Sequence, residues 1–181
     1  MKKFIAMILM LSFALAIPAF AENIEATDIN WNEEAEQTFI DSGYVGTWTT
    51  LEDVNCKLIV PEGFVEEELT DEDKANNLVH IFVNQETGAT IKVFDSQIDS
   101  MEDLASIGNA LHEKNPDQPI QFAHINGAGA VINAIPTDDV VNTIFDLGNH
   151  RYYQIMFTGM LAEQNQLMTL CMASIQFANV G

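Results

Sequence analysis

The stretch IQFAHINGAGAVINAIPTDDVVNTIFDLGNHRYYQIMFT, residues 120–158, carries the clearest structural pattern in the chain. Its first half has two runs of apolar and β-branched residues on either side of Asn126-Gly127, a dipeptide that strongly favours a two-residue hairpin turn. Its second half repeats this arrangement around Gly148-Asn149-His150. Strands joined by such tight turns must pair antiparallel. The pattern therefore predicts a four-stranded meander over 120–125, 130–135, 140–147 and 151–158.

Similar runs extend this meander toward the N-terminus. Segments rich in β-branched and aromatic side chains predict strands at 44–51, 56–60, 78–83 and 90–94. Helical periodicity predicts helices at 31–41, from Ser100 to Pro116, and at 161–177. Helices that alternate with antiparallel strand pairs are typical of the α+β class. The chain is therefore predicted to form an antiparallel meandering sheet covered by helices.

Polar residues mark where the helices are expected to begin. Asn30 is placed to cap the helix at 31–41, because the acids that follow it suit the positive end of the helix dipole. Ser100 is the expected cap of the middle helix, with Asp103 three residues later completing a capping box. The run from Glu66 to Asp73 holds six acids in eight residues and is predicted to be a solvated connecting segment.

The N-terminus has the layout of an export signal. Lys2 and Lys3 precede an apolar run that ends at Ile17, and the small-x-small site Ala19-Phe20-Ala21 follows. The run is shorter than the ~20 apolar residues of a membrane span. An uncleaved N-terminal anchor is the alternative. The sequence predicts a secreted or extracytoplasmic protein with a signal peptide helix at 1–21, a flexible lead-in at 22–30 and a single α+β domain at 31–181.

The acidic composition limits the possible partners. The chain carries 27 Asp and Glu against 7 Lys and Arg, a formal net charge of −20. Removing residues 1–21 takes away two basic residues and no acidic one, which leaves 5 basic against 27 acidic residues and a charge of −22. Neutralising the phosphates of nucleic acid or of anionic lipids needs clustered Lys and Arg. The composition therefore excludes nucleic acid and anionic membrane surfaces, and leaves an unknown protein or small ligand.

Three segments resemble the PsbP-like fold, named for an extrinsic protein of photosystem II. They are the turn Pro61-Glu62-Gly63-Phe64 at a strand end, the helix start Ser100-Met101-Glu102-Asp103-Leu104, and the Asn126-Gly127 meander that leads to Ala173-Ser174-Ile175. The resemblance covers residues 56–177, about two thirds of the chain, and implies an α/β/α sandwich. It also implies an accessory or partner-binding role rather than an enzymatic one. No functional residue carries over, because the family's docking contacts have no matching motif here.

A second resemblance lies closer to the N-terminus. The segment Trp31-Asn32-Glu33-Glu34 resembles the Trp-containing acidic helix at the start of small, uncharacterised secreted proteins of anaerobic Gram-positive bacteria. This resemblance implies a bacterial, secreted protein and adds no site residue.

The sequence shows no catalytic or cofactor-binding motif. Its histidines are separated by 32, 12 and 26 residues, so none has the close partner that a transition-metal site normally shows. His80, His112, His124 and His150 are therefore interpreted as structural or surface residues. The Gly-x-Ser-x-Gly elbow of serine hydrolases is missing as well. No cofactor is predicted, and a hydrolase that uses carboxylates or a histidine is kept as an alternative.

Cys56 and Cys171 are the two thiols of the chain. One interpretation is a disulfide, which an exported protein permits and which would close a loop of over 100 residues, a contribution on the order of 4 kcal/mol. The other is two small buried apolar residues. A catalytic thiol is not expected, because the sequence places no histidine or cation next to either cysteine.

The acidic run also raises a calcium alternative. Glu68, Asp71 and Asp73 offer the oxygen ligands that Ca²⁺ prefers. The spacing and glycine of an EF-hand loop are missing from this run. The alternative function is a calcium-responsive acidic secreted protein.

Aromatic residues in the strands give the one positive indication of a ligand surface. Trp48, Tyr152 and Tyr153 are candidate binding residues for a sugar or a peptide. Tyr44 could join them on an exposed aromatic face of the sheet. Packing within the core is the alternative. Because neighbours in a strand point to opposite faces, at least one of Tyr152 and Tyr153 is expected to face solvent or the less covered side. The leading prediction is an exported, acidic, non-enzymatic binding or accessory module.

Overall fold

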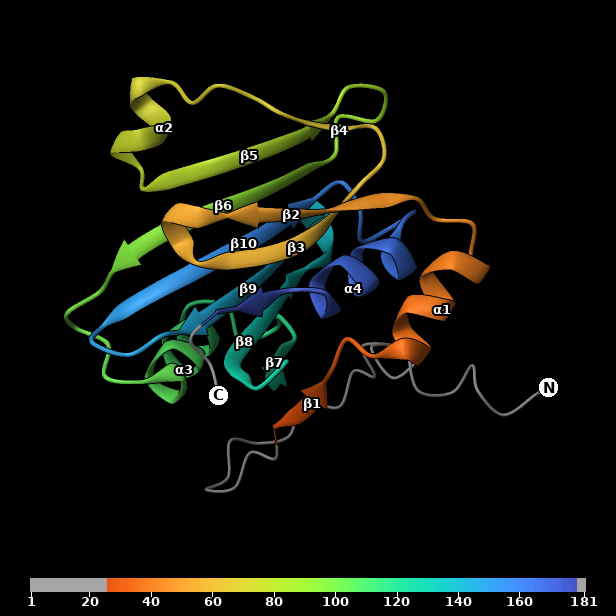
Figure 1. Ribbon diagram of the computed structural model, residues 1–181. Helices are drawn as coiled ribbons and strands as arrows, with labels where there is room; N and C mark the ends of the chain where they lie inside the picture. Colours follow the sequence, from red (N-terminus) through yellow and green to blue (C-terminus); the bar gives the residue numbers. More distant parts are fainter. Residues whose placement is uncertain (1–25, 179–181) are drawn as a thin grey trace.

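Two β-sheets carry the fold of residues 26–178, the part of the chain that the computed structural model describes (Figure 1). The large sheet contains β1 (Thr27–Ile29), β4 (Phe64–Glu66), β5 (Leu78–Asn84), β6 (Thr90–Gln97), β7 (Ile120–Ile125), β8 (Ala128–Ile135), β9 (Val140–Asp146) and β10 (Arg151–Thr158). Its strand order is β1-β7-β8-β9-β10-β6-β5-β4. The small sheet contains β2 (Gly46–Leu51), β3 (Cys56–Pro61) and β11 (Gln176–Phe177), in the order β11-β3-β2.

The α-helices are short. They are α1 (Glu33–Asp41), α2 (Asp71–Ala75), α3 (Leu104–Lys114) and α4 (Asn165–Ala173). Single 3₁₀ turns follow β2 and β8, at Glu52–Val54 and Pro136–Asp138. The mixture of a large sheet with packed helices confirms the predicted α+β class.

The meander predicted over residues 120–158 is confirmed. Strands β7, β8, β9 and β10 are consecutive neighbours in the large sheet and pair antiparallel. Asn126 (φ 48°) and Gly127 (φ 86°) both have the positive φ that a two-residue hairpin turn of this kind requires. Asn and Gly tolerate this region better than other residues, which is why the dipeptide predicts the turn.

The main core lies between the large sheet and a second layer made of the small sheet and α4 (Figure 1). Alternate residues of β8, such as Ala130 and Ile132, point into this core together with Leu58 of β3 and Met168 of α4. Helix α3 covers the opposite face of β7 and β8. There Gly108 lets the helix approach closely, because an added Cβ would lie 2.5 Å from Cζ of Phe122. The arrangement is an α/β/α sandwich, as predicted.

The N-terminal expectations need two corrections. Residues 27–29, predicted to belong to a flexible lead-in, form β1 and pair parallel with β7. Asn32, not Asn30, caps α1, and its side-chain oxygen accepts from the N–H of Ala35 at 3.0 Å. The flexible lead-in was predicted to be too long, because a three-residue strand has no periodicity that can be recognised without its partner.

The small sheet is the second difference from the predicted meander. The strands at Gly46–Leu51 and Cys56–Pro61 pair with each other but do not join the large sheet. The terminal helix, expected at 161–177, is confined to α4, and the chain then adds β11 to the other side of β3. Ser174 ends the helix as its C-cap, and its buried hydroxyl accepts from the N–H of Ile59 in β3 at 2.8 Å.

The expected start of the middle helix is corrected, whereas the acidic run at 66–73 is solvated as predicted. The middle helix begins at Leu104 and is capped by Asp103, whose carboxylate accepts from the N–H of Ser106 at 2.8 Å, so Ser100 is not its cap. The acidic run is exposed along most of its length, as predicted for a solvated segment, and its two ends belong to β4 and α2. Thr70 and Asp73 form the capping box that starts α2.

The predicted signal peptide at 1–21 lies outside the described residues. Within residues 26–178, none of the helices is long and apolar enough to span a membrane. The signal and the domain boundaries stay predictions.

Candidate functional site

Trp48 is the one predicted binding residue that the structure exposes. It lies on β2 with 41% of its surface accessible to solvent. The ring of Trp31 packs edge-on against it, with the two centroids 5.6 Å apart. Lys57 of the neighbouring strand β3 lies over the Trp48 ring, 5.1 Å from its centroid. The indole is therefore held in place from two sides while remaining accessible.

A chain of ring contacts connects Trp48 to the core. Trp31 also packs edge-on against Phe39 at 6.2 Å, and Phe39 contacts Tyr44 at 5.7 Å. We call Trp31, Phe39, Tyr44 and Trp48 the aromatic cluster. Phe39 is buried against Ile59 and Leu170, which anchors the cluster to β3 and α4. Aromatic side chains that are held rigid by packing against the core are well suited to binding, because little conformational entropy is lost when a partner contacts them.

Exposed aliphatic side chains adjoin the aromatic cluster in sequence. Ile40, next to Phe39, is 58% exposed, and Val45, next to Tyr44, is 59% exposed. Together with Trp48 they account for three of the four large apolar residues that are exposed in the described part of the chain. The fourth, Val65, lies on β4 at the edge of the large sheet. Exposed apolar residues are thus concentrated around α1 and β2.

Tyr152 and Tyr153 are both buried, which corrects the prediction that one of them faces solvent. Tyr152 is 1% exposed and donates its hydroxyl to the carbonyl of Met101 at 3.1 Å. Tyr153 is 2% exposed and stacks on Phe177 of β11, with the ring centroids 5.8 Å apart. The two rings do point to opposite faces of β10, but the loop before α3 covers one face and β11 covers the other. Neither tyrosine offers an open binding face.

A hollow of about 680 Å³ lies between the β9–β10 turn and the β2–β3 turn, with Tyr153 and Arg151 in its wall. Arg151 is already paired, since its guanidinium donates two hydrogen bonds to the carboxylate of Asp95 and lies over the ring of Tyr153. This pairing with Asp95 raises the pKa of the arginine further above its already high usual value. Asp146, the other charged residue of the wall, accepts from the N–H of Gly148. The two charged residues of the wall are thus both hydrogen-bonded within the protein.

His80 forms a link between the two sheets that the sequence did not predict. Its Nδ1 lies 2.7 Å from a carboxylate oxygen of Glu66, and its Nε2 lies 2.8 Å from one of Asp53. Glu66 belongs to β4 of the large sheet, whereas Asp53 lies in the turn between β2 and β3 of the small sheet. Carboxylates only accept hydrogen bonds, so both are made when the imidazole carries two protons. We call His80, Glu66 and Asp53 the histidine clasp.

The clasp has a defined electrostatic effect. Burial of the His80 ring, whose side chain is 16% exposed, lowers its pKa, but the hydrogen bonds and charges of Glu66 and Asp53 outweigh burial and hold the pKa above its ordinary value. A base with both nitrogens occupied cannot take a proton from a substrate. The clasp therefore gives no support to the hydrolase alternative.

Replacing His80 with asparagine is expected to change stability in a pH-dependent way. Because the folded-state pKa is raised, the stabilisation by the clasp is fully present below the unfolded-state pKa near ~6.5 and is lost as the pH rises through the folded-state pKa. Because both carboxylates are about half exposed, the clasp should contribute on the order of 1 kcal/mol. We therefore expect His80→Asn to lower the free energy of unfolding by about that much more at pH 5.5 than at pH 8.5. Urea unfolding at pH 5.5 and 8.5 measures it.

Glu66→Gln and Asp53→Asn provide the matched controls, since each removes one partner and should remove part of the same pH dependence. The clasp would be refuted as a protonated link if wild type and His80→Asn differed by the same free energy of unfolding at both pH values.

The remaining histidines lie on three different elements. His124 on β7 is half exposed and lies 3.2 Å from Asp28, and His150 in the β9–β10 turn lies 2.8 Å from the carbonyl oxygen of Met101. His112 lies on α3. In residues 26–178, no group of three or more His, Cys, Asp or Glu side chains is arranged so that it could hold a metal ion.

Glu68, Asp71 and Asp73, the candidate calcium ligands, are not gathered around a common point in the described chain. The Asp73 carboxylate is used within α2, where it accepts from the N–H and the hydroxyl of Thr70. These hydrogen bonds lower the pKa of Asp73. The calcium alternative gains no support from this geometry and stays untested.

Cys56 and Cys171 are free thiols in the structure. Both belong to the main core, Cys56 at the start of β3 and Cys171 on α4. Burial raises the pKa of each thiol to about 12. Thiols with so high a pKa are poor nucleophiles at neutral pH, which fits a packing role.

The fold and the exposed aromatic cluster together define a PsbP-like α+β protein with a candidate partner-binding surface. Among solved structures, the chain is similar to the cyanobacterial PsbP protein CyanoP from Synechocystis, with 7% identity and a TM-score of 0.52 over 73% of this chain and 92% of that chain. It is also similar to the Ran-binding protein Mog1p of Saccharomyces cerevisiae, with 13% identity and a TM-score of 0.43 over 74% of this chain and 96% of that chain. No family model and no curated protein sequence matches the chain. At such low identity the likeness to CyanoP shows the fold alone, which confirms the predicted PsbP-like architecture.

Proposed function

We propose that the protein is an exported, non-enzymatic accessory module that binds a protein partner through the aromatic cluster around Trp48. The observation that carries this proposal is the exposure of Trp48, with 41% of its surface accessible on a strand at the edge of a sheet. Tryptophan is the residue type most enriched among those that dominate binding energies. The support from Trp31 and Lys57 keeps the indole oriented before a partner arrives.

The paired state of the reactive side chains supports a non-enzymatic role. In the described residues, His80 has both nitrogens bound to carboxylates, and Arg151 is bound to Asp95. The hollow beside Tyr153 has two charged residues in its wall, Arg151 and Asp146, and both are hydrogen-bonded within the protein. The resemblance to the PsbP-like fold, which accessory proteins use, agrees with this role but does not establish it.

Export is supported by the N-terminal sequence. The predicted leader ends at Ala21, and a mature chain with a charge of −22 would be kept soluble by self-repulsion outside the cell. The partner would then lie in the cell envelope or outside it.

The exported protein is expected to begin at Glu22, so its intact mass should be lower than that of the uncleaved chain by residues 1–21. We expect this because the small-x-small site at Ala19-Phe20-Ala21 directs cleavage after Ala21. Mass spectrometry of the extracytoplasmic fraction measures it. Alkylation in urea without reductant should add two groups, at Cys56 and Cys171, whereas a disulfide would add none. A full-length mass in that fraction would contradict cleavage, and absence of the protein from it would contradict export.

Truncating Trp48 is expected to weaken partner binding by at least thirtyfold, which corresponds to about 2 kcal/mol for a central tryptophan. A photoreactive p-benzoylphenylalanine at position 48 should crosslink one discrete partner, and excess wild-type protein should compete it away. The affinity of that partner for wild type and for Trp48→Ala is then measured by calorimetry.

Val65 provides the matched control, because it is 57% exposed on an edge strand of the other sheet. Val65→Ala should bind as wild type does, and the photoreactive residue at position 65 should not capture the partner. Identical crosslinking from positions 48 and 65 would contradict the proposed surface.

A further inference from the structure

We propose that the partner adds an extended segment carrying Lys or Arg as a new strand along the open edge of β2. This inference rests on the proposed function and specifies how the surface around Trp48 is used. Strand addition joins two chains by main-chain hydrogen bonds, while side-chain contacts select the sequence. The backbone and side chains of β2, and the charges that flank this strand, each support the inference.

The hydrogen-bond alternation shows which backbone groups of β2 face outward. The carbonyl of Val45, just before β2, accepts from the N–H of Glu62, so this facing pair is a hydrogen-bonded one. In an antiparallel pair such residues alternate with non-hydrogen-bonded ones. Thr47 and Thr49 therefore direct their N–H and C=O toward β3. Gly46, Trp48 and Thr50 direct theirs away from it.

An independent contact agrees with this assignment. Ile59 faces Trp48 across the β2–β3 pair, and its N–H points away from β2 to the hydroxyl of Ser174 at 2.8 Å. A residue whose N–H leaves the ladder belongs to a non-hydrogen-bonded pair, so the backbone of Trp48 must also point away. Within residues 26–178, β2 pairs with β3 alone. Its outward groups are left for solvent or a partner.

The edge of β2 lacks the protection that exposed strands usually have. Proteins guard open edges by making them short or by placing charges, prolines or bulges on them. The other edge strands follow this rule, since β1 and β4 have three residues each and β11 has two. β2 has six residues, GTWTTL, with no charge and no proline, and it pairs with β3 in unbroken register. An unprotected edge of this length fits a binding function.

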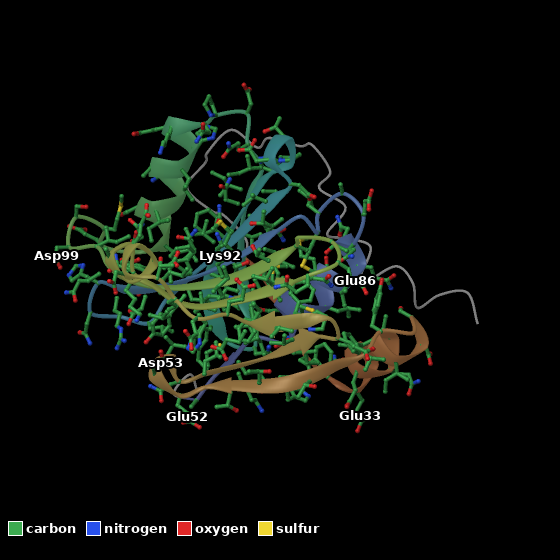
Figure 2. All side chains as sticks on the ribbon, turned by 90° about the horizontal axis from the view of Figure 1, so that it is seen from above. Glu33, Glu52, Asp53, Glu86, Lys92 and Asp99 are labelled. Carbon is green, nitrogen blue, oxygen red and sulfur yellow. The ribbon has the colours of Figure 1, made fainter. Side chains whose placement is uncertain are left out.

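The charges at the two ends of β2 favour a basic segment. Glu33, Glu34 and Glu36 lie in the first turn of α1, next to Trp31, and Glu52 follows β2 directly. Figure 2 shows Glu33 at the α1 end of the small sheet and Glu52 with Asp53 at the opposite end. Lys57, the one cation on β3, is occupied over the ring of Trp48. A segment with cations near both of its ends would meet carboxylates at each.

The acidic residues at the two ends of β2 also disfavour a second copy of this chain as the partner that pairs with this edge. Two mature protomers that paired through β2 would bring the same acidic ends together, and each would carry a net charge of −22. A sugar stacked on Trp48 would use the ring but not the outward backbone groups. Self-association through β2 and sugar binding at Trp48 can each be distinguished from strand addition by experiment.

The experiment uses the seven-residue peptide Lys-Thr-Val-Thr-Val-Thr-Lys, blocked at both ends, and two variants of it. One variant has Glu in place of both Lys, and the other has alternate amides N-methylated so that one edge cannot pair. Titration is followed by NMR of the isotope-labelled protein, with amide hydrogen exchange at each position of β2. We expect the Lys peptide to protect the amides of Gly46, Trp48 and Thr50, and both variants to bind at least tenfold more weakly.

A substitution in the protein, rather than in the peptide, tests the same edge of β2. Thr50→Pro removes an outward N–H without touching the pairing with β3, and proline is tolerated where the N–H of an edge strand faces solvent. We expect at least a tenfold loss of peptide affinity, with no loss for Val65→Ala. If Thr50→Pro does not fold, the N-methylated peptide tests the same hydrogen bonds.

Several results would overturn strand addition. These are equal binding of the N-methylated peptide, tighter binding of the Glu peptide, absence of binding by the Lys peptide, or protection outside β2. Protection of the outward amides by self-association alone, seen as a dimer in sedimentation, would assign the edge to a second copy. If Trp48→Ala weakens binding of the crosslinked partner while Thr50→Pro does not, the proposed function stands and strand addition fails. If position 48 captures no partner, the proposed function itself fails.

Discussion

Replacing Asn126 with alanine is expected to lower the free energy of unfolding by about 3–4 kcal/mol, from three lost hydrogen bonds and a strained backbone. The Asn126 side chain donates to the carbonyls of Ala173 and Ile175 at 2.8 and 2.7 Å, and it accepts from the N–H of Trp31 at 2.7 Å. It thereby ties the β7–β8 turn to the end of α4 and to the segment before α1. Alanine would leave these partly buried groups without partners.

Asn55→Ala separates the hydrogen bonds from the backbone effect. Asn55 has the same φ of 48° as Asn126 and also lies in a turn between paired strands, but its side chain makes none of the hydrogen bonds found in the described structure. We therefore expect Asn55→Ala to cost about 1 kcal/mol, the strain of alanine in the left-handed region. Chemical unfolding of both variants measures the difference. Equal losses would show that the side-chain hydrogen bonds of Asn126 contribute little.

Phe145→Ala is the second substitution with a large expected effect, about 3–5 kcal/mol of unfolding free energy. Phe145 is completely buried on β9 and packs edge-on against Phe177 of β11, with the ring centroids 4.9 Å apart. Its removal would open a cavity between the large sheet and the small sheet. It would also loosen β11, because Phe177 would lose one of its two ring contacts and keep the stacking on Tyr153.

Phe177→Ala is the matched comparison. Phe177 is only partly buried, so we expect a loss of about 1–2 kcal/mol. The double variant should be less destabilised than the sum of the two single variants, by about 0.5–1.5 kcal/mol, which is the usual energy of an aromatic pair. A loss below ~1 kcal/mol for Phe145→Ala would contradict this account of the core.

The parts of the fold that follow from local chemistry could be predicted from the sequence. The β7–β8 and β9–β10 hairpins are confirmed because Asn126-Gly127 and the Gly148–His150 turn specify their own conformations, with positive φ at each of these residues. The class of the fold then follows from the order of helices and antiparallel pairs. None of this requires knowledge of distant contacts.

The parts that depend on distant contacts were missed. β1 and β11 have three and two residues, too few for a recognisable period, and exist because β7 and β3 provide partners. The separation of the small sheet depends on packing against α4, which no local pattern reports. Asn32 and Asp103 replaced the predicted caps because several polar residues lie near each helix start and only the folded chain selects one.

The candidate site shows the same division. Alternation correctly placed Tyr152 and Tyr153 on opposite faces of a strand, but it could not say that both faces are covered. The histidine clasp was missed because the partners of His80 lie 14 and 27 residues away in sequence. Trp48 was singled out by residue type, and its role in binding stays a prediction.

The pairing of β11 with β3 has a consequence for how the chain folds. Gln176 and Phe177 pair with Lys57 and Cys56, so this ladder joins segments about 120 residues apart. Contacts of such high sequence separation slow folding, because the entropy of closing a long loop is lost before the contact forms. The ladder also cannot form until residue 177 has been synthesised. We therefore expect completion of the small sheet to be a late kinetic step, after the 120–158 meander has formed from contacts between neighbouring strands.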